Sequence, residues 1–361
     1  MNVYIFIPIW IGIMAVVAAS NQNLTKKRIV SGAEINQTNI IFAIITFLPI
    51  FFTVSMGDII GDVWSYIEGY KQLSTSFADI DWSAKGPGFT FIEVIIKRIF
   101  GNNVDAFRLM IALIQSIPIV FIFRYYSSNY IMSMYLFVAT AFYVGWMMNG
   151  LRQFTAAAII FAATPLLVKK KYVPLIIVIL LASTIHNTAL IMLPVIFIVQ
   201  GQAWNRKTVL FIIAAIIAMY VFGNNMSLFD SAIESAGLDY SVTAAQESGD
   251  TGTSFFRVLV NMVPMIIALI YRKKIDANNK FINICVNMSV ITSGLYLISM
   301  VTSGILIGRL PVYTALYDLI LLPYLVKNVF NEHDSKFVTI AMVVLYIIYY
   351  WYQMHFVNGL I

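Results

Sequence analysis

Long apolar stretches separated by short polar segments run along almost the whole chain. A helix that crosses a bilayer needs about 20 predominantly apolar residues, and fewer when helices are short or broken. The pattern therefore predicts an all-α polytopic transmembrane protein with about 12 membrane-spanning helices, within a range of roughly 10 to 14, and a single integral membrane domain over 1–361. The predicted spans are roughly 3–19, 39–56, 104–123, 130–149, 154–168, 172–184, 188–199, 208–223, 255–271, 281–303, 310–326 and 337–353.

The stretch Tyr172–Val199 allows two interpretations. One continuous helix of its 28 residues would measure about 42 Å, which is too long for one span and too short for two full ones. Polar residues interrupt its middle around His186. A single span would also move the acidic segment 224–254 to the cytoplasmic side. We therefore predict two short helices that meet near His186 at the outer face.

The positions of the lysines and arginines predict the topology. If sides alternate from an outer N-terminus, 15 of the 23 Lys and Arg residues lie in inner segments and 8 lie outside. Because short cytoplasmic loops carry an excess of these residues, this assignment is self-consistent and puts both termini outside. The inner loops are short. The larger loops, 57–103 and 224–254, are predicted outside, and 89–100 has the pattern of an amphipathic interfacial helix.

Composition excludes several classes of protein. The chain is 60% hydrophobic and 11% charged, with a mean hydropathy of +0.84, whereas a soluble domain carries about 25% charged residues. The net charge of +6 lies mostly in short clusters between predicted spans, so no nucleic-acid partner is expected, and membrane lipids are the expected surroundings. The single cysteine, Cys285, excludes a disulfide framework and a cysteine zinc site, and three scattered histidines form no metal cluster. No metal and no cofactor are predicted.

Charged residues at the outer boundary are the first candidates for chemistry, because a charge in or beside a membrane is costly. Arginine stays charged and donates to two oxygens at once, so it can neutralise a phosphate or pyrophosphate without a metal. The alternative is that these side chains contact lipid headgroups or close turns. The candidates are Arg108, Arg152, His186, Arg257 and Arg309.

Two further groups could carry chemistry. His186 is a possible general base, since its imidazole titrates near physiological pH, and the alternative is a hydrogen-bonding packing role. Asp79 and Asp81 could hold a metal as a pair, but an acidic solvated loop explains them better.

Several segments, in order, resemble the EpsG family of Wzy-like polysaccharide polymerases. Asn149-Gly150-Leu151-Arg152-Gln153 resembles that family's N-G-[IL]-R-Q motif, and Ala182–Leu190 resembles its A-x-x-x-H-x-[ST]-A-L segment around His186. Gly61-Asp62 with Tyr66 and Tyr70 resembles the acidic first-loop pattern, and Arg309 with Tyr313 is similar to a late R-x-x-x-Y element. Gly86-Pro87-Gly88-Phe89 resembles the family's E-P-G-F segment, with Gly86 in place of the usual acid, so no acid is expected to act there.

The resemblance implies a membrane glycosyltransferase with a GT-C-like architecture in the bacterial inner membrane. Such an enzyme joins oligosaccharide repeat units carried on undecaprenyl pyrophosphate, at the outer face, into O-antigen, capsule or exopolysaccharide. A chain-length regulator and a flippase are the partners it implies. The alternatives are a lipid-linked oligosaccharide flippase or transporter and an O-antigen ligase.

On this interpretation the residues take specific roles. Arg152 and Arg309 would stabilise the departing pyrophosphate, and His186, or Asp62 as second choice, would take the proton of the attacking hydroxyl. The expected substrate-binding residues are Arg108, Gln153, Asn149, Glu68, Asn187 and Tyr313.

Overall fold

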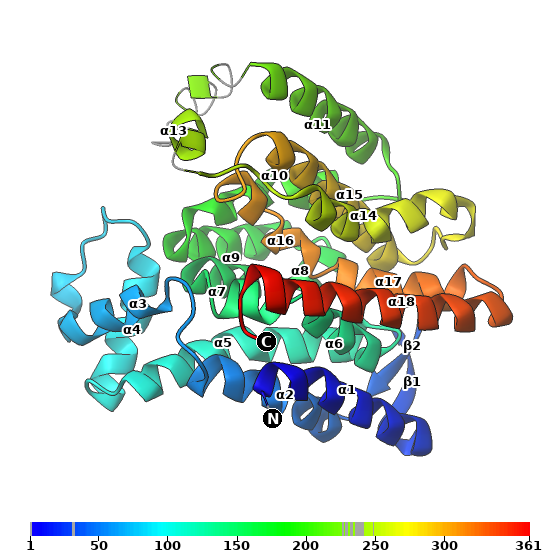
Figure 1. The fold of residues 1–361 in the computed structure, drawn as a ribbon, viewed down its shortest axis with the longest axis horizontal. Helices are drawn as coiled ribbons and strands as arrows, with labels where there is room; N and C mark the ends of the chain where they lie inside the picture. The colour runs from blue at the N-terminus through cyan, green and yellow to red at the C-terminus, as the bar shows by residue number, and fades with distance from the viewer. Residues whose placement is uncertain are drawn as a thin grey trace. The chain divides into compact units, whose positions relative to one another are not determined.

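The computed structural model describes residues 2–30, 33–225, 227, 230–231, 234, 242–247 and 249–361. The chain forms two compact units, of which the first comprises Met1–Met192 with Val326–Ile361 and the second Leu193–Leu325. Much of the predicted outer loop 224–254 lies outside the described residues. The described part of the chain is mostly helical (Figure 1), as predicted.

The first unit contains the N-terminal half of the chain and the last long helix. Its elements are α1 (Val3–Ser20), β1 (Thr25–Val30), β2 (Ala33–Thr38), α2 (Ile40–Met56), α3 (Val63–Gln72), α4 (Pro87–Phe100), α5 (Val104–Tyr126), α6 (Tyr130–Ala139), α7 (Leu151–Ala162), α8 (Thr164–Val168), α9 (Tyr172–Ile185) and α18 (Glu332–Tyr352). Helix α6 packs against both α1 and α18. The Tyr350 hydroxyl of α18 donates to the Tyr4 carbonyl of α1 at 2.7 Å, so a hydrogen bond joins the first and last helices; the Tyr350 hydroxyl also lies 2.7 Å from the Tyr143 hydroxyl.

The second unit is built around one buried helix. Its elements are α10 (Met192–Ile198), which begins at the boundary, α11 (Arg206–Asn224), α13 (Val242–Glu247), α14 (Phe255–Ile270), α15 (Lys280–Val301), α16 (Val312–Ala315) and α17 (Asp318–Asn328), whose last residues belong to the first unit. Helices α11, α14 and α16 all pack against α15.

Each predicted apolar segment coincides with a helix or a helix pair. Among the described residues, five helices are long and apolar enough to cross a membrane, and a sixth candidate is a pair of helices bent by 54°. Six further apolar helices are shorter, which is typical of short or broken spans. Membrane-type helices are therefore present along the chain, and the number of crossings stays a prediction.

The break predicted near His186 is present. Helix α9 ends at Ile185, His186 is extended with φ −149°, and a 3₁₀ turn over Asn187–Ile191 leads into α10. The polar residues at this point interrupt the helix because their side chains offer the backbone alternative hydrogen-bond partners.

The fold differs from the sequence-based expectation in three places. Thr25–Val30 and Ala33–Thr38 form an antiparallel hairpin within a chain predicted to be all-α, in register Thr25 with Thr38; β-branched residues suit paired strands. The predicted span 154–168 is divided at Ala163, because Pro165 begins a new helix in α8. The predicted span 310–326 is divided between α16 and α17, with the bend of 54° at the break.

Helix α4 has the predicted position in the 57–103 loop, but it does not divide into one buried apolar side and one exposed polar side. Glu93 and Lys97 are only 9% and 8% exposed and are buried together with apolar residues such as Val94, whereas Phe91 and Ile99 are 40% and 67% exposed. The Lys97 ammonium donates to the carbonyls of Tyr70 and Lys71 at 2.7 and 2.8 Å, which satisfies the C-terminal end of α3. The exposed apolar face is what an interfacial helix presents to lipid.

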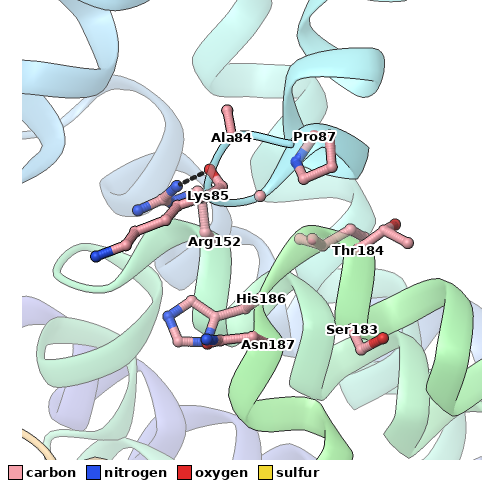
Figure 2. Close-up of a pocket in the computed structure, with 10 residues that line it drawn as sticks. Ala84, Lys85, Pro87, Arg152, Ser183, Thr184, His186 and Asn187 are labelled. Atoms are coloured by element: carbon pink, nitrogen blue, oxygen red, sulfur yellow. Dashed lines mark hydrogen bonds between the residues drawn. The ribbon is translucent and has the colours of Figure 1, made fainter. Parts of the chain in front are cut away.

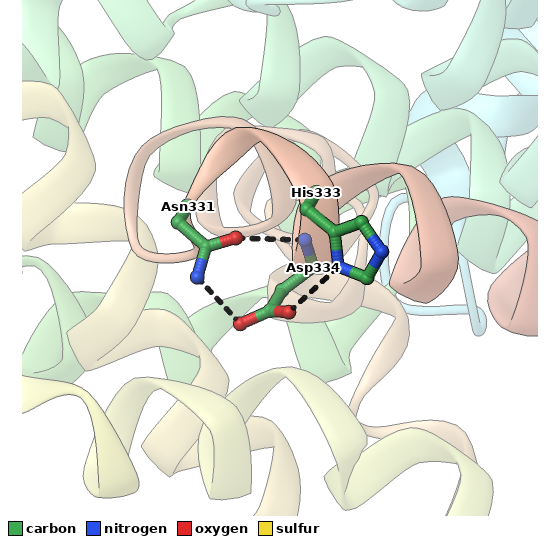
Figure 3. Close-up of polar contacts among 3 residues, drawn as sticks. All are labelled: Asn331, His333 and Asp334. Carbon is green, nitrogen blue, oxygen red and sulfur yellow. Dashed lines mark hydrogen bonds and ion pairs between the residues drawn. The ribbon is translucent and has the colours of Figure 1, made fainter.

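The N-terminus of α18 shows how the helix boundaries follow from local chemistry. The Asn331 side chain accepts from the Asp334 backbone N–H and donates to the Asp334 carboxylate, both at 2.8 Å (Figure 3). His333 lies 3.4 Å from the same carboxylate and is almost fully exposed. This histidine therefore belongs to a helix cap.

Candidate active site

A pocket of about 370 Å³ in the first unit brings together the two segments with the most specific motifs. Figure 2 shows Lys85, Arg152 and His186 at one side of this pocket and Ser183 and Thr184 at the other. The lining residues are Ala84, Lys85, Gly86, Pro87, Arg152, Ser183, Thr184, Ile185, His186 and Asn187. They come from the loop before α4, the first turn of α7 and the end of α9.

The start of α7 is held in place by the first loop. Gly150 caps α7 with φ +118°, a conformation that favours glycine. Its N–H donates to Oδ1 of Asp62 at 3.1 Å. In the first loop, Gly61 leaves room for the Asn149 side chain. A Cβ at residue 61 would lie 2.3 Å from Oδ1 of Asn149. Asp62 and Asn149 therefore fix the turn from which Arg152 projects.

Two hydrogen bonds orient the Arg152 guanidinium. Its Nε donates to the Tyr66 hydroxyl at 3.2 Å, and one terminal nitrogen donates to the Lys85 carbonyl at 2.8 Å. The guanidinium carbon also lies 5.6 Å from the centre of the Tyr66 ring. Arginine has five N–H donors, and these bonds use two of them. The remaining donors are available to an anion in the pocket.

Close packing of the loop before α4 explains the glycines of Gly86-Pro87-Gly88. A Cβ at Gly86, where φ is +82°, would lie 2.9 Å from both the Arg152 guanidinium and the Ile185 carbonyl. A Cβ at Gly88 would lie 2.1 Å from the Thr184 hydroxyl. Gly86 therefore lets the backbone approach Arg152 directly.

We expect Gly86→Ala to disturb the pocket beyond its cost in backbone strain. Left-handed backbone costs a non-glycine residue about 1–2 kcal/mol, and the new methyl would also displace Arg152. Gly101→Ala is the control, because Gly101 also has a positive φ, 66°, but open space around its Cβ position. Both variants should lower the unfolding temperature. Inorganic pyrophosphate, as an anion for the remaining donors of Arg152, should raise the unfolding temperature of the wild type and of Gly101→Ala but not that of Gly86→Ala. Loss of this effect in both variants would contradict the packing argument.

His186 is oriented by the segment that follows it. Its Nδ1 lies 2.7 Å from the Thr188 hydroxyl, which also accepts from the Gln153 side-chain amide at 3.2 Å. Gln153, one residue after Arg152, is 4% exposed. The Gln153–Thr188–His186 chain therefore links the two motifs, and Asn187 lines the same pocket.

Glu93 of α4 adds a carboxyl group next to this site. Burial raises its pKa to about 8, while the positive charge of Arg152 acts to lower it. At neutral pH the carboxyl is therefore mostly protonated, and it does not neutralise Arg152. Lys85 adds a second positive charge, so the pocket carries net positive charge.

The raised pKa of Glu93 predicts a pH dependence of stability. In the unfolded chain the pKa of this carboxyl is about 4.3. Between that pH and a pH of about 8, the folded state therefore holds a proton that the unfolded state has lost. Folding stability should therefore fall by about 1.4 kcal/mol per pH unit as pH rises through this interval. Glu93→Gln should remove that loss.

Unfolding temperatures from pH 5 to 9 test this expectation. Glu68→Gln is the matched control, because Glu68 is partly exposed and pairs with Lys71 at 2.7 Å. It should follow the wild-type pH profile. A Glu93→Gln profile parallel to the wild type would show that this carboxyl does not hold its proton.

The other predicted residues of the first unit lie outside the pocket. Arg108 donates to the Gly57 carbonyl at 2.6 Å and lines a separate small pocket with Asp58 and Gln115. Glu68 forms its ion pair on the outer face of α3. These contacts give Arg108 a role in closing the turn after α2.

Arg309 and Tyr313 lie in the second unit. Arg309 ends a short 3₁₀ turn, Ile307–Arg309, and Tyr313 is buried in α16. Asp250 holds the preceding segment: its carboxylate accepts from the Ser303 hydroxyl at 2.5 Å and from the N–H groups of Gly304 and Ile305 at 2.9 and 3.1 Å. Burial acts to raise the pKa of Asp250, but these hydrogen bonds outweigh it and lower the pKa.

Sequence reasoning missed Lys85, Glu93 and Asp250 as residues of interest. Asp79 and Asp81, considered as a metal pair, accept hydrogen bonds from the serines of their own loop, Ser74 and Ser83. No group of three or more His, Cys, Asp or Glu residues that could hold a metal occurs in the described part of the chain.

Comparison with known proteins gives one match. The family model described as EpsG family matches residues 38–360. No curated protein and no solved structure matches the chain.

Proposed function

The chain belongs to the EpsG family, and on this premise we propose that it polymerises oligosaccharide repeat units carried on undecaprenyl pyrophosphate. The reaction would take place at the outer face of the bacterial inner membrane and would produce O-antigen, capsule or exopolysaccharide. The helices with the length and apolarity of membrane spans support a membrane location.

The observation that carries this proposal is the pocket of Lys85, Arg152 and His186. A pyrophosphate needs fixed positive charge and several N–H donors. Arg152 uses two of its N–H groups within the protein and keeps the others for a ligand, and Lys85 adds a second positive charge. A hydroxyl nucleophile needs a base, and the imidazole of His186 lines the same space. Pyrophosphate binding and proton removal are the two demands of glycosyl transfer from a lipid pyrophosphate.

The proposed step moves the growing chain to the incoming unit. The hydroxyl oxygen of the incoming unit forms a bond to the anomeric carbon of the growing chain, and the bond between that carbon and the pyrophosphate oxygen breaks. The proton of the hydroxyl passes to His186, and the undecaprenyl pyrophosphate leaves with the bonding electron pair, its charge stabilised by Arg152 and Lys85. Asp62 would act through Gly150, by positioning the turn that carries Arg152.

A gel profile of surface and lipid-linked glycans tests the proposal. Cells that lack the chain should carry single repeat units at the surface, and the wild-type gene should restore a ladder. Loss of all surface glycan, with units trapped on the inner face, would indicate a flippase instead. Ladders that form normally but stay on the lipid carrier would indicate a ligase.

The reaction should need no divalent metal, since arginine and lysine supply the positive charge. We expect polymerisation by the protein in membranes to continue at its full rate in excess chelator. A strict Mg²⁺ requirement would contradict this and would direct attention to Asp79 and Asp81.

A further inference from the structure

A buried acid in the second unit, Asp318, takes no part in the contacts described above. Asp318 begins α17 at the point where the helix pair bends by 54°. The residue is 5% exposed, and neither oxygen of its carboxyl group has a hydrogen-bond partner. None of the described lysines, arginines or histidines forms an ion pair with it.

The facing helix carries further buried oxygens without partners. In α15, the hydroxyls of Ser289 and Ser293 are both buried and make no hydrogen bond. They are four residues apart and so share one helix face. The Ser289 and Thr292 hydroxyls lie close to the Asp318 carboxyl, although neither completes a hydrogen bond with it. Thr292 also bonds Thr314 of α16 at 2.7 Å, which joins α15 to the first half of the bent pair.

Such a group of oxygens needs an explanation, because buried polar atoms in proteins are almost always paired with a group, a water or an ion. An ionised carboxylate without a partner is especially costly away from water. Two serine hydroxyls and one carboxylate are all hard oxygen ligands, and with the acid ionised they carry a single negative charge, which a bound cation would balance. That set matches a monovalent cation, whereas Ca²⁺ sites collect six to eight oxygens and usually several carboxylates.

The break in the helix places a helix C-terminus near Asp318. In transporters with interrupted membrane helices, unwound carbonyls and the C-terminal ends of half-helices coordinate Na⁺. Here that end belongs to α16, which stops at Ala315, three residues before Asp318.

We propose that Asp318, Ser289 and Ser293 bind a sodium ion that fixes the bend between α16 and α17. The first half of the bent pair begins at Ile307 and includes Arg309 and Tyr313. The ion would therefore hold the segment that carries these two residues in one orientation. The proposal does not depend on the polymerase function.

Thermal unfolding of the purified full-length protein tests the proposal. The unfolding temperature is measured against NaCl concentration, with choline chloride keeping ionic strength constant. A saturable increase with Na⁺ is expected for the wild type, since a ligand bound only by the folded state stabilises it. Asp318→Asn should show no such increase.

Two further variants keep the test decisive. Asp276→Asn removes an exposed acid of the same unit, whose carboxylate accepts only from the nearby Asn278 N–H at 2.9 Å, and should keep the full sodium effect. Ser289→Ala should raise the half-saturating Na⁺ concentration by about tenfold, through loss of one ligand, and it serves if Asp318→Asn does not fold.

A sodium effect that persists in Asp318→Asn, or an equal effect of choline, would overturn the proposal. A wild-type unfolding temperature that changes with pH but not with Na⁺ would identify Asp318 as a protonated acid and would also overturn it.

Discussion

Arg152→Lys is expected to reduce polymerisation by at least about 100-fold, the loss found when one preorganised donor to a developing anion is removed. Lysine keeps the charge but has no planar fork, so it cannot donate to Tyr66 and the Lys85 carbonyl while also gripping two pyrophosphate oxygens. Surface glycans of complemented cells should therefore shift from a ladder to single units.

The matched control is Arg98→Lys, in the same 57–103 segment as Tyr66 and Lys85. Arg98 is exposed, and its guanidinium lies 4.7 Å from the centre of the Phe77 ring, outside the pocket. This variant should make a normal ladder. The purified proteins should show the same contrast with inorganic pyrophosphate, which should stabilise the wild type and Arg98→Lys but not Arg152→Lys. A normal chain-length distribution in Arg152→Lys would remove this arginine from the mechanism.

The helices could be predicted from the sequence because membrane helices satisfy their own backbone groups, so apolar length alone indicates where they are. The break at His186 followed from polar residues within an apolar stretch. The bend at Asp318 could not be predicted in the same way, because neither Pro311 nor Asp318 shows by itself how far two half-helices turn. The pairing of Thr25–Val30 with Ala33–Thr38 was also missed, because the charged run Lys26-Lys27-Arg28 after an apolar stretch has the pattern of a cytoplasmic loop rather than the alternation of a strand.

The orientation of α4 shows where amphipathic patterning reaches its limit. The pattern predicts an amphipathic helix over 89–100, and the structure has a helix there. Glu93 and Lys97 are nevertheless buried, beside apolar residues such as Val94. Periodicity assigns such charged residues to solvent, whereas Lys97 is buried because it donates to the carbonyls at the end of α3.

The candidate site was predicted in part. Arg152 and His186 share one pocket, as their common assignment to the reaction requires. Lys85 and Glu93 were missed because a single charge in a polar loop or on a helix face is usually solvated, and only the fold brings them to Arg152. Arg108 has another environment, since nearness to the outer boundary in the sequence does not fix which cavity a side chain lines.

His186→Ala is the second large effect that we expect, with a loss of about 10²- to 10⁴-fold in polymerisation rate, the usual contribution of a general base. The Thr188 hydroxyl at 2.7 Å from Nδ1 orients the ring, so Thr188→Val should cause a smaller loss of the same kind. Pyrophosphate should still stabilise both variants, because the leaving-group residues are intact.

His333→Gln serves as the control, since His333 lies exposed at the α18 cap (Figure 3) and should be dispensable. The competing assignment makes Asp62 the base. Its Oδ1 already accepts from Gly150, so we expect Asp62→Asn to weaken pyrophosphate stabilisation along with activity, as a displaced Arg152 would. Near-normal ladders in His186→Ala, together with lost activity and intact pyrophosphate binding in Asp62→Asn, would transfer the base role to Asp62. The two assignments can be distinguished because His186 would act on the incoming hydroxyl, whereas Asp62 would act through the turn that carries Arg152.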